Sequence, residues 1–350
     1  MTSAGKESMR VAVWYNNRDV RVEKMPIPKI GPGELLLRIE ASGICGSDVM
    51  EWYRRDRAPL VLGHEIGGQV VGVGNGVENY KEGDRVSAAH HVPCNTCYYC
   101  LRGHHTMCDT LRKTNFDPGG FAEYVRLPAL NVDRGVFLLP EEMSYEEATF
   151  IEPLACVLRG QRTARIQPGD SVLIIGSGIA GLLHLQLART LGARRIIATD
   201  INDFRLEAAK RFGADVAMNA REYSPARLRE VNDGYLADLV IVCTGAATAV
   251  DQALGSIERG GTVLLFAPTD PGVSTPVSLN EVFWRTDVTL TTSYGASPYD
   301  YQTALDLIRA KAVPVQKMIT HRLALAETGL GFQLVAAAGD SIKVIIEPQK

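Results

Sequence analysis

The sequence predicts an α/β protein in which a β-rich domain accompanies a domain built on a doubly wound parallel sheet. Two observations support this fold class. The first third of the chain is made of short alternating runs separated by glycine-rich turns, and from about residue 156 apolar strands alternate with helical patterns. Strands that alternate with helices of roughly 10–15 residues are typical of parallel βαβ units. A length of 350 residues agrees with two domains.

The expected elements follow in chain order. Alternating runs predict strands at Arg10–Val13, Glu34–Glu40 and Gly67–Gly74. Apolar runs then predict strands at Ser171–Gly176, Arg195–Asp200, Asp238–Thr244, Gly261–Phe266 and Val288–Ser293. Helices are expected up to Leu191 and over Asn202–Phe212.

The segment after Gly295 is too short for a domain of its own. It is expected to form helices at Tyr299–Ala310 and Ala324–Ala336 and a strand at Ile342–Ile346. We therefore expect residues 296–350 to return to the β-rich domain of residues 1–155, leaving 156–295 as the parallel-sheet domain.

Composition excludes several classes of function. The formal net charge is −3, whereas a protein that grips nucleic acid or an anionic membrane needs a strong basic excess. The first ten residues, MTSAGKESMR, lack the apolar core of a signal peptide, and the apolar run from Val172 to Ala188 is interrupted by glycines and polar residues. We expect a soluble cytoplasmic protein without a nucleic-acid or membrane partner.

A glycine motif indicates a dinucleotide. Gly176-Ser177-Gly178-Ile179-Ala180-Gly181 fits G-x-G-x-x-G, stands between an expected strand and helix, and is followed by Asp200 at the end of the next strand. Gly176 would permit the tight turn, Gly178 the approach of pyrophosphate, and Gly181 close packing of helix on strand. The helix start would stabilise the phosphate charge.

Asp200 favours NAD over NADP. Its carboxylate would accept hydrogen bonds from the ribose hydroxyls and repel a 2′-phosphate. Arg205, five residues later, is a further candidate for contact with the cofactor. Ligands of open α/β sheets lie beyond the carboxyl ends of the strands. Three further candidates for contact with the nicotinamide end lie at or after expected strand ends: Thr244, Phe266 and Ser293.

Two sets of residues are expected to bind metal. Cys94, Cys97, Cys100 and Cys108 have the spacing C-x2-C-x2-C-x7-C, which suits a closed structural zinc site. The second set is dispersed: Cys45 follows the second expected strand, His64 and Glu65 are adjacent, and Glu152 precedes a proline. Three ligands of the Cys, His and carboxylate types leave one position open, which is the pattern of catalytic zinc.

These motifs together resemble the zinc-containing medium-chain alcohol dehydrogenases. The resemblance rests on Cys45-Gly46-Ser47-Asp48, on Gly63-His64-Glu65 with its following glycines, on the four-cysteine segment, on Glu152-Pro153-Leu154 and on the glycine motif, in family order along nearly the whole chain. Glu152 resembles the sorbitol and threonine dehydrogenase branch. The resemblance implies a GroES-like catalytic domain, a Rossmann domain that binds NAD, and two zinc ions per chain.

The resemblance also implies roles for single residues. Cys45 and His64 would hold the catalytic zinc with Glu65, Glu152 or both, and the sequence leaves open which carboxylate is the ligand. Ser47 would take the proton of the alcohol. Many relatives have a histidine where this chain has Met50, so the route of the proton beyond Ser47 stays open.

Trp52 and Phe116 fall where the family lines its substrate pocket, and other pocket positions include Arg112 and Asn115. The expected activity is hydride transfer between NAD and a small secondary alcohol such as a polyol, cyclitol or sugar. Three alternatives remain: an L-threonine 3-dehydrogenase, a zinc-free reductase of the same superfamily, and a non-catalytic nucleotide-binding sensor. The family further implies a homodimer or homotetramer, with the strand Val288–Thr292 as a candidate for pairing between chains.

Overall fold

The computed structural model describes residues 7–350, so part of the N-terminal stretch without signal-peptide character lies outside it. The chain divides into two compact units. Unit 1 contains the described residues up to Ala155 together with Ala296–Lys350, and unit 2 contains Cys156–Gly295. Within the described part, no helix is both long enough and apolar enough to span a lipid bilayer.

Unit 1 is built on β-sheets to which both ends of the chain contribute. Its strands are β1 (Ser8–Asn16), β2 (Asp19–Pro26), β3 (Leu35–Gly43), β4 (Leu60–Val61), β5 (Glu65–Val73), β6 (Arg85–Ala88), β7 (Tyr124–Leu127), β8 (Val136–Leu138), β15 (Ile319–Ala324) and β16 (Lys343–Glu347). Its helices are α1 (Glu51–Arg54), α2 (Asp109–Lys113), α3 (Ala129–Gly135), α4 (Tyr145–Ala148), α11 (Pro298–Arg309) and α12 (Thr328–Ala337).

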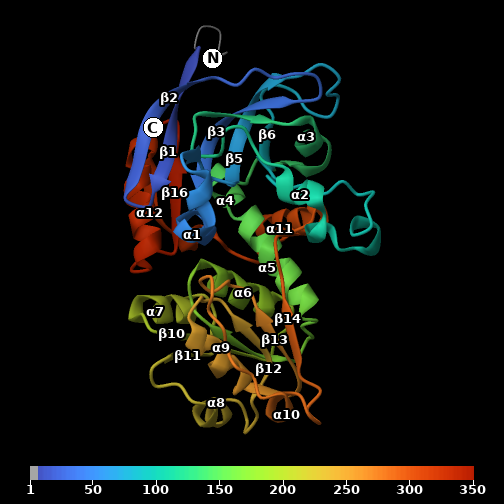
Figure 1. Ribbon diagram of the computed structural model, residues 1–350, viewed down its shortest axis with the longest axis vertical. Coiled ribbons are helices and arrows are strands. Elements are labelled where there is room, and N and C mark those ends of the chain that lie inside the picture. The colour runs from blue at the N-terminus through green and yellow to red at the C-terminus, as the bar shows by residue number, and fades with distance from the viewer. Residues whose placement is uncertain (1–6) are drawn as a thin grey trace. The chain divides into compact units, whose positions relative to one another are not determined.

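The larger sheet of unit 1 has seven strands in the order β15-β16-β3-β5-β6-β8, with β7 also paired to β3. Figure 1 shows the red C-terminal segment beside the blue N-terminal strands. In register, Glu65 of β5 lies opposite Gly43 of β3, and Ile345 of β16 pairs with the same Gly43. The end of β3, the start of β5 and the start of β16 therefore meet at one edge of this sheet.

Unit 2 contains a parallel sheet in the strand order β11-β10-β9-β12-β13-β14. Its strands are β9 (Ser171–Ile175), β10 (Arg195–Asp200), β11 (Val216–Asn219), β12 (Ala237–Val242), β13 (Ile257–Leu265) and β14 (Thr289–Thr292). Its helices are α6 (Ile179–Thr190), α7 (Asp203–Arg211), α8 (Pro225–Val231), α9 (Ala247–Leu254) and α10 (Leu279–Val282), and α5 (Ile151–Thr163) crosses the boundary between the units.

Chain order in this sheet reads 3-2-1-4-5-6, the order of the doubly wound nucleotide-binding fold. The central strand β9 has the sequence SVLII and is buried throughout, because helices cover both faces of such a sheet. The order reverses between β9 and β12, which pair with Ile175 opposite Val242. Ligands of such folds bind beyond the carboxyl ends of the strands at this reversal. The predicted α/β fold class is thus confirmed.

Candidate active site and cofactor site

The glycine motif lies directly at the reversal of strand order in unit 2. Gly176 follows β9 with φ of 95°, a backbone conformation that favours glycine, and a Cβ there would lie 3.1 Å from the carbonyl oxygen of Cys243. A Cβ on Gly181 would overlap the carbonyl oxygen of Gly176, so α6 can pack this closely on the turn only with glycine there. A Cβ on Gly178 would instead have 3.6 Å to its nearest neighbour, Nη1 of Arg205.

Asp200 is held in place by backbone hydrogen bonds. Its Oδ2 accepts from the N–H of Ser177 at 2.8 Å and its Oδ1 from the N–H of Asn202 at 2.9 Å. Each carboxylate oxygen keeps lone-pair capacity for a further donor. The carboxylate therefore links the glycine turn to the start of α7.

The guanidinium of Arg205 reaches over the same turn. Its Nε is buried and finds no hydrogen-bond acceptor among the described residues. Its Nη1 lies near Gly178, where the sequence predicts pyrophosphate. A buried, unpartnered donor atom on a half-buried arginine beside the glycine turn fits an anionic group that binds there, and this agrees with the phosphates of a dinucleotide.

Unit 2 also has a surface hollow of about 480 Å³. Its lining includes Ile201, which follows Asp200 in the chain, Ala220 after β11 and Thr248 at the start of α9, together with charged side chains such as Arg221. Because Ile201 adjoins Asp200, this hollow is a candidate place for the adenosine half of a dinucleotide.

Thr244, two residues after β12, lies next to the turn itself: a Cβ on Gly176 would be 3.2 Å from the Cβ of Thr244.

The remaining predicted cofactor contacts differ in their surroundings. Ile179 and Ala180 form the first turn of α6. The half-buried ring of Phe266 packs edge-on against the buried His184 at 4.5 Å, and its backbone N–H donates to the carbonyl oxygen of Val242 at 3.1 Å. Ser293 follows β14, and its Oγ is buried without a partner among the described residues.

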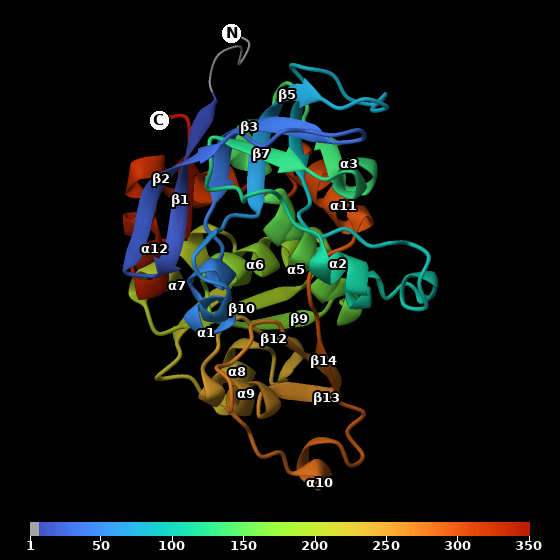
Figure 2. The same cartoon turned by 45° about the horizontal axis from the view of Figure 1, so that its top comes forward.

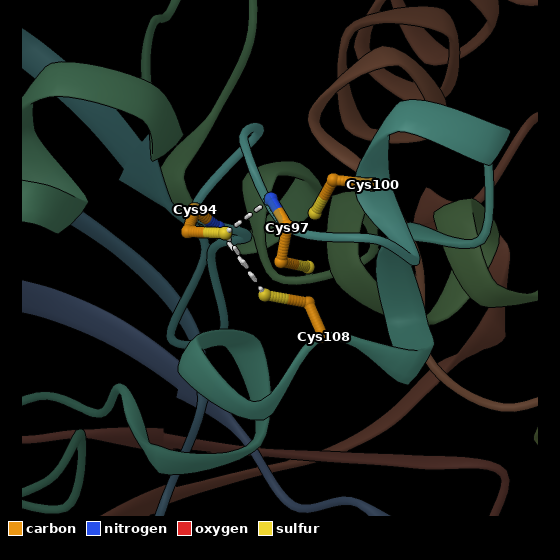
Figure 3. A group of neighbouring side chains, drawn as sticks. All are labelled: Cys94, Cys97, Cys100 and Cys108. Carbon is orange, nitrogen blue, oxygen red and sulfur yellow. Dashed lines mark hydrogen bonds between the residues drawn. The ribbon is translucent and has the colours of Figure 1, made fainter.

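The four cysteines of the predicted structural site come together in unit 1. Figure 2 shows the chain before α2 as an extended loop, and Figure 3 shows the four side chains facing a common centre. Their sulfur atoms all lie within 4.8 Å of one another. Zinc–sulfur bonds of about 2.3 Å in a tetrahedron require sulfur atoms about 3.8 Å apart. Cys94 and Cys108, whose sulfurs are 3.6 Å apart, meet this requirement.

Backbone groups prepare this cluster for a cation. The N–H of Thr96 donates to Sγ of Cys94 at 3.5 Å and is the main cause that lowers the pKa of this thiol to about 5. The N–H groups of Cys97 and Cys94 donate to neighbouring sulfurs at 3.3 and 3.4 Å. Such hydrogen bonds stabilise thiolates, the form that binds zinc. With four donors, the cluster fits a closed structural site.

The predicted ligands of the catalytic metal also lie close together, with the exception of Glu152. Ligand atoms of Cys45, His64 and Glu65 lie within 4.8 Å of one another. Cys45 follows β3, whereas His64 and Glu65 lie at the start of β5, so the pairing of these two strands brings the three together. Glu152, on the first turn of α5 and largely buried, does not belong to this cluster.

Local hydrogen bonds fix the turn that carries Cys45. The N–H of Cys45 donates to Oδ2 of Asp48 at 3.0 Å, and Sγ of Cys45 accepts from the N–H and the hydroxyl of Ser47, both at 3.4 Å. The result is a reciprocal cap of the short 3-10 turn Gly46–Val49. The hydroxyl of Ser47 thereby lies beside the thiol of Cys45, a candidate metal ligand.

Asp48 also orients His64. Its Oδ1 is fully buried and lies 3.4 Å from Nδ1 of His64. Burial raises the pKa of Asp48, but His64 and Arg54 outweigh that effect, so the pKa is lowered overall. A carboxylate on Nδ1 leaves Nε2 of the imidazole for a metal ion, the arrangement found around most histidine ligands. The donor set and its orientation thus fit zinc.

Glu65 has a charged partner that the sequence analysis did not identify. Nζ of Lys343, the first residue of β16, forms an ion pair with its Oε2, and both side chains are about 1% exposed. Gly43 lies between these two side chains, and a Cβ on Gly43 would overlap both of them. A single lysine in the apolar run from Ile342 to Ile346 was the available signal, because an isolated buried charge requires a partner.

Two further histidines form a row of ring contacts with His64. The ring centroids of His64 and His90 are 4.7 Å apart, and those of His90 and His91 are 3.9 Å apart. Burial lowers the pKa of His91 to about 4, so this ring is neutral near pH 7. Phe116 packs in the main apolar core of unit 1 with its ring 6.2 Å from His90, whereas Trp52 on α1 is 41% exposed.

The chain matches two families of protein domain. Residues 31–140 match the alcohol dehydrogenase GroES-like domain, and residues 180–310 match the zinc-binding dehydrogenase domain. The match to the first covers the metal-binding motifs, and the match to the second covers most of unit 2.

Complete proteins match along nearly their whole length. Sorbitol dehydrogenase of Bombyx mori is 34% identical, with 97% of this chain and 98% of the relative aligned. L-threonine 3-dehydrogenase of Symbiobacterium thermophilum is 32% identical over 93% and 94%. A zinc-binding dehydrogenase of Sinorhizobium meliloti, solved with NADP bound, has a TM-score of 0.88 and 28% identity over 98% and 100%. With the metal-binding geometry above, these matches show that the chain belongs to the zinc-containing medium-chain alcohol dehydrogenases, in their sorbitol and polyol dehydrogenase branch.

Proposed function

We propose that the chain oxidises a secondary alcohol of a polyol, cyclitol or sugar with NAD, and catalyses the reverse reduction, at the cluster formed by Cys45, His64 and Glu65. The observation that carries this proposal is the cluster itself. It offers three donor atoms rather than four, next to a serine hydroxyl, and so leaves room for the substrate oxygen. The four-cysteine cluster has no such position.

The bound groups supply the electrophile and the hydride acceptor. Zinc held by Cys45, His64 and Glu65 would supply a Lewis acid for the substrate hydroxyl, and bound NAD would supply the acceptor of the hydride. The protein's residues do the rest: Asp48 orients the imidazole of His64, and the backbone of the turn fixes the thiol of Cys45. The hydroxyl of Ser47 is placed to accept the proton of the alcohol.

The role of the carboxylates is part of the proposal. Glu65 supplies the third donor, and its ion pair with Lys343 compensates one negative charge beside the metal. Glu152, outside the cluster, is then the alternative ligand that becomes available only after a movement of the chain. Since Met50 cannot carry a proton, water is the proposed carrier beyond Ser47.

A panel of substrates tests the function. NADH formation would be followed with sugar alcohols, cyclitols, amino sugars, simple secondary alcohols and L-threonine, each with NAD and with NADP. We expect NAD-linked turnover of one polyol-like class, lost in Cys45→Ser. Turnover of L-threonine alone would favour the activity of an L-threonine 3-dehydrogenase, an enzyme to which the chain is also similar. Zinc-loaded protein that is inactive with every compound would contradict the proposal.

We further propose a homo-oligomer assembled through unit 2 and a cytoplasmic location. Strand β14 is the last strand of its sheet, and Leu290 on it and Trp284 before it are 40% and 69% exposed. Edge pairing between two copies would cover them. All seven cysteines are free thiols, which suits a reducing compartment. Light scattering of Leu290→Lys, expected to yield smaller particles than the parent chain, tests the interface.

A further inference from the structure

Arg54 is fixed beside the residues of the proposed active site. It lies on α1, and its side chain is 13% exposed. Nε donates to the carbonyl oxygen of Ser47 and Nη2 to the hydroxyl of Ser47, both at 3.2 Å. The guanidinium carbon also lies 4.6 Å from the ring centre of Tyr53. These contacts hold a permanent positive charge beside Ser47, whose hydroxyl lies between Arg54 and the thiol of Cys45.

One end of this guanidinium is available to a ligand. No described residue accepts a hydrogen bond from Nη1 of Arg54, whereas Nε and Nη2 are both engaged. Nη1 is not one of the buried polar atoms without a partner among the described residues. An atom that has no partner and is not buried is accessible to solvent. Its two N–H groups therefore face outward from a guanidinium whose orientation Ser47 has already fixed.

Negative charge near Arg54 is scarce. Asp48 is the one carboxylate of the described residues within ion-pair distance, at 3.8 Å, and it is shared with His64. The guanidinium carbon of a second cation, Arg57, lies 5.2 Å from the ring centre of Tyr53, and this arginine has no carboxylate partner among the described residues. A substrate at this position would therefore meet an excess of positive charge.

We propose that Arg54 is a specificity-determining residue that binds an anionic oxygen group of the substrate, a carboxylate or a phosphate, close to the reacting carbinol. The inference rests on the proposed function, which places that carbinol at Cys45, His64 and Glu65. Arginine suits carboxylate and phosphate oxygens, and a guanidinium that is already oriented loses little freedom on binding. A neutral polyol would leave the charge without a partner.

Matched five-carbon substrates test this inference. Xylitol, D-xylonate and xylitol 5-phosphate offer similar carbinols with no charge, a carboxylate or a phosphate. We expect kcat/KM for one anionic compound to exceed that for xylitol by at least about 10-fold. Arg54→Met should lower that value by about 100-fold and the value for xylitol far less, so that the preference for the anionic compound disappears. Arg54→Lys should restore part of the loss.

Arg55→Met is the matched control, because Arg55 is exposed and pairs with Glu51 on the same helix. Three results would overturn the inference: preference of the parent chain for xylitol, an equal loss for all three compounds in Arg54→Met, or a rise in KM for NAD alone. The second result would mean that Arg54 merely positions Ser47, and the third that it binds the cofactor.

Calorimetry separates this inference from the proposed function. D-xylonate and xylitol 5-phosphate would be titrated into zinc-loaded protein with NADH bound, with and without Arg54→Met. Binding that depends on Arg54 without turnover would support the inference while contradicting the proposed reaction. Absence of binding by both anions would overturn the inference even if neutral alcohols are oxidised.

Discussion

Nδ1 of His64 lies 3.4 Å from Oδ1 of Asp48, and this carboxylate is completely buried. The pair connects a candidate metal ligand at the start of β5 to the turn that follows β3. Because that same turn carries Cys45, one carboxylate contacts two candidate ligands that are 19 residues apart in the chain.

Asp48→Asn should weaken zinc binding at the catalytic cluster without unfolding unit 1. The amide keeps the size of the carboxylate but lacks its negative charge, so the ionic contact with Nδ1 of His64 is lost. Loss of such a partner lowers metal affinity by about 10–100-fold. Equilibrium dialysis with a competing chelator measures this affinity. Asp56→Asn on the exposed neighbouring turn is the control, and equal affinity in both variants would show that Asp48 does not orient the ligand.

Gly178→Ala and Gly181→Ala should fail in different ways. A Cβ at position 181 overlaps the carbonyl oxygen of Gly176, so unit 2 should lose about 1–3 kcal/mol of stability. A Cβ at position 178 has 3.6 Å of clearance and should leave stability unchanged while lowering NAD affinity. Thermal unfolding and NADH fluorescence distinguish the two. If Gly178→Ala binds NAD as tightly as the parent chain, the pyrophosphate does not bind at this turn.

Asp200→Ala should reduce the preference for NAD. The carboxylate is held by two backbone N–H groups beside the glycine turn, where it would bind the ribose hydroxyls and repel a 2′-phosphate. We expect KM for NAD to rise by about 10-fold or more and KM for NADP to stay constant or fall. The exposed Asp203→Ala is the control. One relative was solved with NADP bound, so turnover with NADP should be measured as well. NADP-linked turnover by the parent chain would contradict the assignment of Asp200.

The four-cysteine cluster should bind one zinc ion that stabilises unit 1. Cys100→Ser should lower the zinc content by one ion per chain and lower the melting temperature, since an incomplete site leaves three thiolates close together. Cys243→Ala removes a buried thiol of unit 2 and is the control. If Cys100→Ser keeps its zinc and its melting temperature, the cluster is not a structural zinc site.

His184 should make stability depend on pH. Burial lowers its pKa to about 3, so between about pH 6.5 and 3 the unfolded chain takes up a proton that the native chain does not. Stability is therefore lost as pH falls below about 6.5. The free energy of unfolding should differ between pH 7.5 and pH 5, and His184→Leu should remove about 2 kcal/mol of that difference. Thermal unfolding at both pH values measures this, with exposed His104→Leu as control; an unchanged difference would refute it.

Much of the fold could be predicted because its signals are local. The expected strand Arg195–Asp200 coincides with β10, and the helix expected over Asn202–Phe212 differs from α7 by one residue at each end. Strand β11 was not predicted, because four half-buried residues carry too short a pattern. Strand β15 was not predicted either, since its sequence ITHRLA mixes polar and apolar residues and depends on pairing with β16.

The active site could be predicted in part. Cys45, His64 and the four-cysteine set stand in recognisable motifs, so their residue types and spacing suffice. The roles of Lys343 and Arg54 depend on tertiary structure: Lys343 reaches Glu65 because β16 joins the edge of β3, and Arg54 reaches Ser47 because a short helix turns its side chain back. Nothing in the local sequence specifies either contact.

Zinc content and the rate of NADH formation, both measured in the parent chain and in Cys45→Ser, decide whether this cluster is the catalytic centre. We expect two zinc ions per chain and NAD-linked oxidation of a secondary alcohol in the parent. In Cys45→Ser we expect one zinc ion, retained by the four cysteines, and NADH formation at the background rate. Full zinc content with undiminished turnover in Cys45→Ser would contradict the assignment of this cluster as the catalytic centre.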